Sequence, residues 1–151
     1  MKQILRYFLL LFFLLGISEC WSQKLVIGSQ RPSMRGIQWQ NKSPKLNKPL
    51  LIEFYHHDNS SSREFLDLLS EIKQQSRGNL EIVILTRDGG KSLTHLNQYY
   101  GDEYLIGYDP TGAVFSSFGV KYIPYSILSD RKGNLLWIGN LSSFDMDLLK
   151  P

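Results

Sequence analysis

Two compact apolar runs with a helical pattern between them constrain the fold of this sequence more than any other feature. The runs, LLIEFY at residues 50–55 and LEIVIL at 80–85, have the length and composition of strands buried on both faces of a sheet. Between them, Phe65, Leu69 and Ile72 recur at helical spacing. A strand, a helix and a strand within about 35 residues are typical of a right-handed parallel crossover. The sequence therefore predicts an α/β fold built on a parallel sheet.

The rest of the sequence continues this alternation and then becomes antiparallel. The turn residues 130–134 join two apolar runs by a connection short enough for a hairpin, with Gly133 at a position of positive φ. We therefore predict a central mixed sheet flanked by helices. The further expected elements are a helix at 91–100, an extended piece at 105–108, a helix at 113–118, strands at 125–128 and 135–139, and a last helix at 144–150.

The first residues have the layout of a secretory signal peptide. Lys2 and Arg6 precede an apolar run at 7–17, and small and polar residues follow it. The run is shorter than the ~20 apolar residues of a membrane-spanning helix. We therefore expect residues 1–22 to be removed by cleavage after Ser22, which leaves a periplasmic or secreted protein without membrane contact beyond its signal peptide.

Cys20, the only cysteine of the sequence, is lost with this signal peptide, and a mature chain without cysteine has no thiol chemistry. An alternative makes Cys20 the N-terminus of a lipoprotein, because residues 15–20 loosely resemble a lipobox, but Glu19 stands where a small residue is required. Residues 23–48 are expected to form an N-terminal arm packed on the domain, and residues 49–151 a single domain.

The charge of the sequence selects no partner. The chain carries 17 Lys and Arg residues against 14 Asp and Glu residues, and the basic residues are scattered without a run or a basic helix face. Neither nucleic acid nor an anionic membrane surface is therefore predicted as a partner.

Three stretches of the sequence resemble one known family. Residues 51–63 (LIEFYHHDNSSSR) are similar to the strand and active-site loop of TlpA and ResA type thiol-disulfide oxidoreductases, which belong to the thioredoxin-like superfamily. Residues 120–139 resemble the cis-proline and hairpin region of that family, and Gly28 with Pro32 resembles its entry segment more weakly. The resemblance covers nearly all of residues 25–150 and implies a thioredoxin fold.

The resemblance places Asn59 and Ser62 on the two redox cysteines of the family, with Ser60 and Ser61 between them. The family reaction begins with a thiolate and ends with a second thiol, and an amide and a hydroxyl perform neither step. The same four residues are also preferred types for capping a helix. Glu53 stands where many members keep a buried acid that handles the proton of the second cysteine, and without that cysteine it is a relic or a structural hydrogen-bonding group.

The resemblance also implies a binding groove. The family's cis proline corresponds to Pro124, and the backbone of Ile123 before it would face the loop of residues 59–62 across a shallow groove, with Tyr55 beside it. A strand edge next to such a groove accepts an extended peptide by strand addition. The alternative is a proline that only defines a turn of the fold.

Three histidines offer a different site. His56 and His57 directly follow the first strand and His95 lies elsewhere. Adjacent residues of an extended strand point in opposite directions, which argues against joint metal ligation. No pattern of serine, histidine and acid indicates an activated serine. The sequence therefore predicts no metal and no cofactor.

Two functions are the main hypotheses, and a metal-binding protein that uses His56, His57 or His95 is a third. The first is an exported, redox-inactive thioredoxin-like protein that binds a protein or peptide partner of the cell envelope through the groove at Tyr55, Ile123 and Pro124. The second is a thiol-disulfide oxidoreductase in envelope redox homeostasis, with a thiol supplied by Cys20 or by a partner. A fold alone does not decide between them.

Overall fold

The structure, a computed structural model, describes residues 24–45 and 47–149. The predicted signal peptide and Cys20 lie outside the described residues. Within the described part of the chain, no helix combines the length and the apolar character needed to cross a membrane.

The described residues form one succession of strands and helices. The expected strands and the first three helices are all present, with ends within two residues of those predicted. The elements are β1 (Gln38–Trp39), β2 (Leu50–Tyr55), α2 (Ser60–Gln75), β3 (Glu81–Thr86), α3 (Gly90–Tyr100), β4 (Leu105–Tyr108), α4 (Ala113–Ser117), β5 (Tyr125–Ser129), β6 (Leu135–Gly139), and the short 3₁₀ helices η1 (Leu141–Ser143) and η2 (Met146–Leu149).

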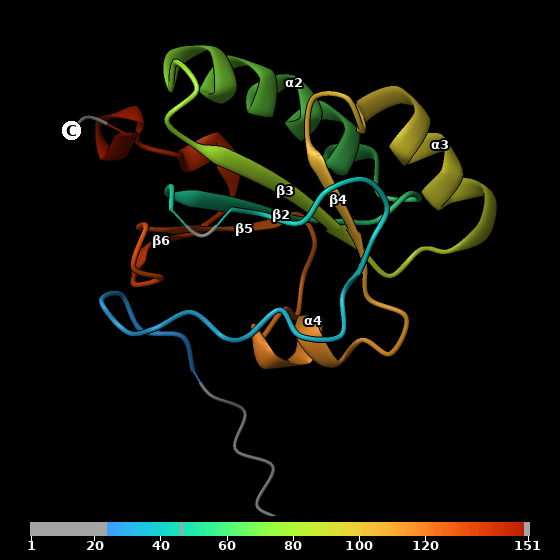
Figure 1. Cartoon of the computed structure of the whole chain (residues 1–151), viewed down its shortest axis with the longest axis horizontal. Helices are drawn as coiled ribbons and strands as arrows, with labels where there is room; N and C mark the ends of the chain where they lie inside the picture. The colour runs from blue at the N-terminus through green and yellow to red at the C-terminus, as the bar shows by residue number, and fades with distance from the viewer. Residues whose placement is uncertain (1–23, 46, 150–151) are drawn as a thin grey trace, which may run out of the picture.

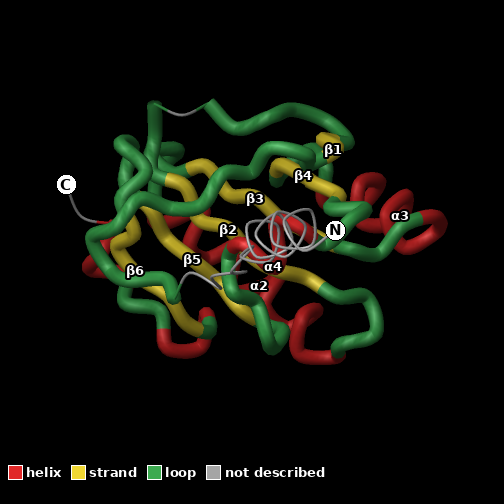
Figure 2. Tube along the Cα trace, turned by 90° about the horizontal axis from the view of Figure 1, so that it is seen from below, coloured by secondary structure: helices red, strands yellow, loops and turns green. Residues whose placement is uncertain are grey.

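The strands form one mixed sheet in the order β1-β4-β3-β2-β5-β6 (Figure 2). β2 is parallel to β3 and β3 is parallel to β4. β5 runs antiparallel to β2, β6 antiparallel to β5, and β1 antiparallel to β4. These pairings confirm the predicted α/β fold with a central mixed sheet flanked by helices.

Side chains alternate between two hydrophobic cores on opposite faces of the sheet. Leu51 and Ile82 belong to the core under α2 and α3, whereas Ile52 and Val83 belong to the core beside α4. Figure 1 shows α2 and α3 on one side of the sheet and α4 with the N-terminal arm on the other. Both faces of β2 and β3 are therefore covered by a hydrophobic core, which explains why the sequences of these strands are continuous apolar runs.

The arm before β2 contributes to the second layer. Ile37 is buried in the core beside α4, and Met34 and Trp39 pack against that core. Gln30 forms an isolated antiparallel bridge with Asn134 of the β5–β6 hairpin. Because α4 has only 5 residues, the arm covers sheet surface that this helix is too short to reach.

The predicted last helix at 144–150 is wrong within the described residues. Only the 3₁₀ helix η2 lies within that range, and Phe144 and Asp145 separate it from η1. The backbone of Phe144 is extended, with φ −70° and ψ 127°. The side chains of Asn140 and Asp145 each accept, at 2.9 Å, a hydrogen bond from the backbone N–H two residues further on. Each of these side chains starts a new turn in competition with a continuous helix.

Candidate functional site

Three loops and the start of β5 meet at one end of the sheet. β2, β3 and β4 are parallel, so their carboxyl ends lie together. The antiparallel β5 begins at the same end, where Tyr125 pairs with Phe54. In open α/β sheets this end is the usual place of ligand binding. The loop at 56–59 and the segment at 120–124 therefore come together as the sequence analysis expects.

Asn59 connects the loop after β2 to the segment before β5. It is the N-cap of α2, and its Oδ1 accepts a hydrogen bond from the backbone N–H of Ser62 at 3.3 Å. Its Nδ2 donates a hydrogen bond to the carbonyl oxygen of Ile123 at 2.8 Å. The peptide bond from Ile123 to Pro124 is cis. The Asn59 side chain thus ties the first turn of α2 to the cis-proline segment.

The serines that follow Asn59 have a different place. Ser60, Ser61 and Ser62 form the first turn of α2, so Asn59 alone is the cap among the four residues that the sequence offers for this role. Ser62 is fully buried, and its Oγ has no hydrogen-bond partner among the described residues. A buried hydroxyl without a partner is uncommon in native structures.

Glu53 lies beneath the same end of α2. On β2 it lies between Leu51 and Tyr55 and shares their sheet face, which α2 covers, and it is fully buried. The hydroxyl of Ser126 donates a hydrogen bond to its Oε2, whereas its Oε1 has no partner within the described chain. Burial raises the pKa of the Glu53 carboxyl to about 8, because a charge in an apolar surrounding is poorly solvated. At neutral pH this carboxyl is mostly protonated.

His56 is held by Asp88, which follows β3. Its Nε2 lies 3.4 Å from the Asp88 Oδ1, and its Nδ1 accepts a hydrogen bond from the backbone N–H of Asp58 at 3.2 Å. The backbone N–H of His57 donates to the Asp88 Oδ2 at 2.5 Å. Both ring nitrogens of His56 therefore have partners, so this ring joins two strand ends and is not poised as a base toward a serine.

The three histidines are not brought together. His95 lies on α3, where its ring stacks on that of Tyr99 with centroids 4.3 Å apart. Across residues 24–45 and 47–149, no group of three or more His, Cys, Asp or Glu side chains is placed to hold a metal ion.

A pocket of about 450 Å³ opens at this end of the sheet, and we call it the strand-end pocket. Tyr55 and Ile123, two of the predicted groove residues, line it, whereas Pro124 does not. Burial raises the pKa of the Tyr55 phenol. The full lining is Tyr55, His56, Arg87, Asp88, Pro110, Phe115, Val120, Lys121 and Ile123.

Sequence reasoning missed the cations of this pocket. Arg87 follows β3, and a Cβ added at Gly112 would lie 2.9 Å from its Nε, so the Arg87 side chain packs on the turn before α4. Lys121 comes from the segment before the cis proline. Beside it, the ring of Tyr122 is 81% exposed. The sequence signal that could have located Arg87 is a polar residue directly after a parallel strand.

No protein-family model matches the sequence, and no curated protein sequence matches it. Solved structures do resemble the fold. The thioredoxin domain of a thiol-disulfide oxidoreductase from Bacteroides vulgatus superposes with a TM-score of 0.65 at 19% identity, over 83% of this chain and 94% of that one. A thioredoxin-like protein solved in its oxidized form gives a TM-score of 0.61 at 17% identity, over 78% of this chain and 86% of that one.

A third structure adds a comparison from another organism. A secreted disulfide oxidoreductase from Mycobacterium tuberculosis gives a TM-score of 0.54 at 14% identity, over 68% of this chain and 78% of that one. At these identities the likeness concerns the fold alone. Together with the sheet order and the helix placement, it shows that the described part of the chain has a thioredoxin-like fold.

Proposed function

We propose that this chain is an exported thioredoxin-fold protein that binds an extended protein or peptide partner of the cell envelope without dithiol chemistry. The observation that carries the proposal is the hydrogen bond of 2.8 Å from Asn59 Nδ2 to the Ile123 carbonyl. It joins the helix cap to the cis-proline segment at the usual binding end of the sheet, through a side chain that cannot form a disulfide.

The absence of a redox pair rests on the composition. Cys20 is the only cysteine of the sequence, and it lies in the segment that we expect to be cleaved. Thiol-disulfide exchange requires a thiolate for attack and a thiol for resolution. Asn59 and Ser62 supply neither, so the fold is proposed to serve binding.

The chemistry of the strand-end pocket favours an acidic or carboxylate-bearing peptide. Arg87 and Lys121 line one pocket with Phe115 and Val120, so cationic groups stand beside an apolar wall. The one carboxylate of the lining, Asp88, is engaged by His56 and by the backbone N–H of His57. Tyr122, 81% exposed next to this pocket, is the type of side chain that anchors peptide interfaces. A bound peptide would cross the pocket and place an aromatic or aliphatic side chain on Tyr122.

Export is supported by the layout of residues 1–22 and is in keeping with the secreted Mycobacterium tuberculosis protein of the same fold. A second candidate function, thiol-disulfide exchange with Cys20 or a partner's thiol, is favoured by the likeness to oxidoreductase structures. N-terminal sequencing of the exported protein separates the two. A mature chain that starts after Cys20 excludes the version that uses this thiol.

The proposal is tested by insulin reduction with the mature protein and with the double variant Asn59→Cys and Ser62→Cys. We expect activity only in the double variant, since its two thiols would stand at the start of α2, where thiolates are stabilised. Activity of the natural protein would overturn the proposal.

Binding is tested separately, by capture from an envelope extract on immobilised protein. Tyr122→Ala should weaken capture of a specific partner about tenfold. The matched control is Tyr99→Ala, because Tyr99 is 63% exposed but lies on α3. Equal capture by both variants would contradict the placement of the binding site.

A further inference from the structure

A second pocket lies where the N-terminal arm meets the β5–β6 hairpin, away from the strand-end pocket; we call it the arm pocket. Backbone hydrogen bonds fix the arm there: the N–H of Arg31 donates to the Gly133 carbonyl at 2.8 Å, and the N–H of Leu135 donates to the Ser29 carbonyl at 2.8 Å. Gly133 has φ +88°, and a Cβ there would lie 3.7 Å from Arg31 Nε. The Arg31 side chain therefore lies on the hairpin turn.

Arg31 places a polar group in the wall of this pocket that no protein atom satisfies. Its Nε is buried and has no hydrogen-bond partner among residues 24–45 and 47–149. Burial also lowers the pKa of its guanidinium. An unsatisfied buried donor is costly, and native structures contain few of them. No side-chain nitrogen of Arg31 donates a hydrogen bond within the described chain, and an oxyanion in the pocket would accept from the terminal guanidinium nitrogens.

The surroundings of Arg31 are cationic. Arg131 and Lys132 also line the pocket, and no acidic residue does. The nearest carboxylate in the sequence, Asp130, accepts hydrogen bonds at 2.8 Å from the N–H groups of Lys132 and Asn134 and from the Asn134 amide. In the described chain the ion pairs lie elsewhere, at His56 with Asp88 and at Lys73 with Glu103. Within the described chain, none of the three cations of the pocket therefore forms an ion pair.

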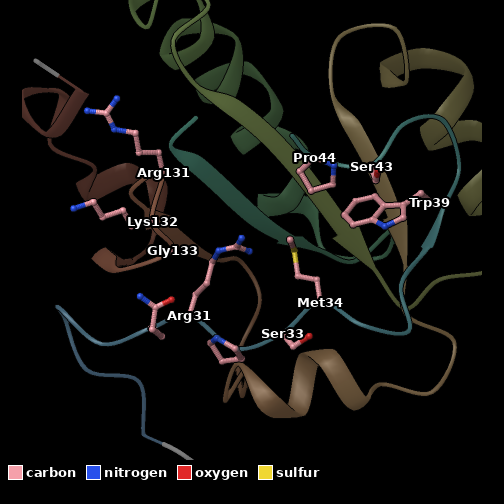
Figure 3. Close-up of a pocket in the computed structure, with 11 residues that line it drawn as sticks. Arg31, Ser33, Met34, Trp39, Ser43, Pro44, Arg131, Lys132 and Gly133 are labelled. Atoms are coloured by element: carbon pink, nitrogen blue, oxygen red, sulfur yellow. The ribbon is translucent and has the colours of Figure 1, made fainter. Parts of the chain in front are cut away.

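The opposite wall is apolar. Figure 3 shows the Arg31 guanidinium beside Met34, with Trp39 and Pro44 across the opening. The side chains of Arg131 and Lys132 extend from the hairpin in the direction away from the Arg31 guanidinium. The pocket measures about 450 Å³, within the range of small-molecule sites. One side thus offers a cation and the other an indole face.

We propose that the arm pocket binds a small phosphate or sulfate monoester of a ring-shaped group. The oxyanion accepts hydrogen bonds from Arg31, whose planar fork suits tetrahedral oxyanions. The ring packs between Met34 and Trp39. Lys132 and Arg131 contribute longer-range attraction that salt weakens.

The test uses the full mature protein, with phenyl phosphate and inorganic phosphate as probes. Isothermal titration calorimetry should show one saturable site for phenyl phosphate, and the Arg31 Nε–Hε resonance should move on titration. Arg31→Gln should weaken binding at least about tenfold. The matched control Arg35→Gln, in an exposed residue of the same arm that does not line the pocket, should leave it unchanged.

Two further experiments test the separate parts of the proposal. Replacing Arg131 and Lys132 together by Gln should reduce the affinity about threefold and flatten its salt dependence. Inorganic phosphate should bind more weakly than phenyl phosphate, and equal binding would overturn the role of Trp39. Equal weakening by Arg31→Gln and Arg35→Gln, or no saturable binding by folded protein, would overturn the site itself.

Discussion

At the strand end Asn59 and His56 bond to neighbouring groups and only Ser62 Oγ and Glu53 Oε1 are buried without a partner among the described residues. In the arm pocket the buried nitrogen of Arg31 has no such partner. Asn59 is bonded to the Ile123 carbonyl, and both ring nitrogens of His56 are engaged. Arg31 Nε is buried and unsatisfied. Groups that satisfy one another stabilise the fold, and a group left unsatisfied within a pocket points to something that the protein binds.

The largest expected effect is a loss of stability with rising pH that is caused by Glu53. This acid is an exception to the contrast between the two pockets, because one of its oxygens has no partner among the described residues although it lies at the strand end. Its folded pKa is about 8, above the ordinary value near 4.5 that we assume for the unfolded chain. The folded state therefore keeps a proton that the unfolded state releases. Stability is highest below the unfolded pKa, falls as pH rises through the window between the two values, and has lost up to about 5 kcal/mol above pH 8.

Glu53→Gln should remove this dependence, because the amide stays neutral and still accepts the hydrogen bond from Ser126. Urea unfolding at pH 5, 7 and 9 measures the effect. Glu71→Gln, in an exposed residue of α2, should keep the wild-type slope. A wild-type stability that does not change between pH 5 and 9 would contradict the burial of an uncompensated carboxyl.

The second effect tests the strand end, where the side chain of Asn59 forms its hydrogen bonds within the protein. Asn59→Ala removes the cap of α2 and the hydrogen bond to the Ile123 carbonyl, so the free energy of unfolding should fall by about 2 kcal/mol. Asn140→Ala is the matched control, since Asn140 caps η1 through one hydrogen bond and should cost about 1 kcal/mol. Equal losses in chemical denaturation would mean that the link to Ile123 contributes nothing.

Much of the fold was readable from the sequence because its signals are local. The apolar runs of β2 and β3 and the helical spacing between them need no distant contact to be recognised. The last helix was mispredicted because Asn140 and Asp145 each cap a new turn, and apolar spacing does not register this competition.

The two pockets also differ in how far apart in the sequence their residues lie. At the strand end His56 directly follows β2 and Arg87 and Asp88 directly follow β3, so a βαβ pattern brings these three together. The arm pocket requires Arg31 to meet Arg131 and Lys132, which lie a hundred residues away. The bridge from Gln30 to Asn134 and the backbone hydrogen bonds around it place them side by side, and no local pattern predicts that pairing. Basic residues that the sequence scatters are therefore gathered by the fold.

The third effect sharpens the geometry of the arm pocket. Gly133→Ala forces a side chain into a backbone with φ +88° and brings its Cβ to 3.0 Å from Gln30 Oε1. It should cost about 1 kcal/mol of stability and weaken phenyl phosphate binding severalfold by displacing the arm. Gly78→Ala has a similar φ of +79° but open space around its Cβ. Gly78→Ala should lower the stability in thermal unfolding by a similar amount and leave the calorimetric affinity for phenyl phosphate unchanged. Reduced binding in both variants would show that Gly133 has no specific role in the arm pocket.

The smallest expected effect is a small gain of stability, and it tests the contrast between the two pockets most directly. Arg31→Met removes a buried donor that no protein atom satisfies and replaces it with an apolar chain beside Met34. Exchanging an unsatisfied polar group for an apolar one is neutral or stabilising. The free energy of unfolding measured in urea should therefore stay level or rise by less than about 1 kcal/mol, while phenyl phosphate binding is lost. A fall of more than about 1 kcal/mol would mean that Arg31 serves the fold. Stability that is kept while binding is lost would mean that the chain keeps this arginine for what it binds.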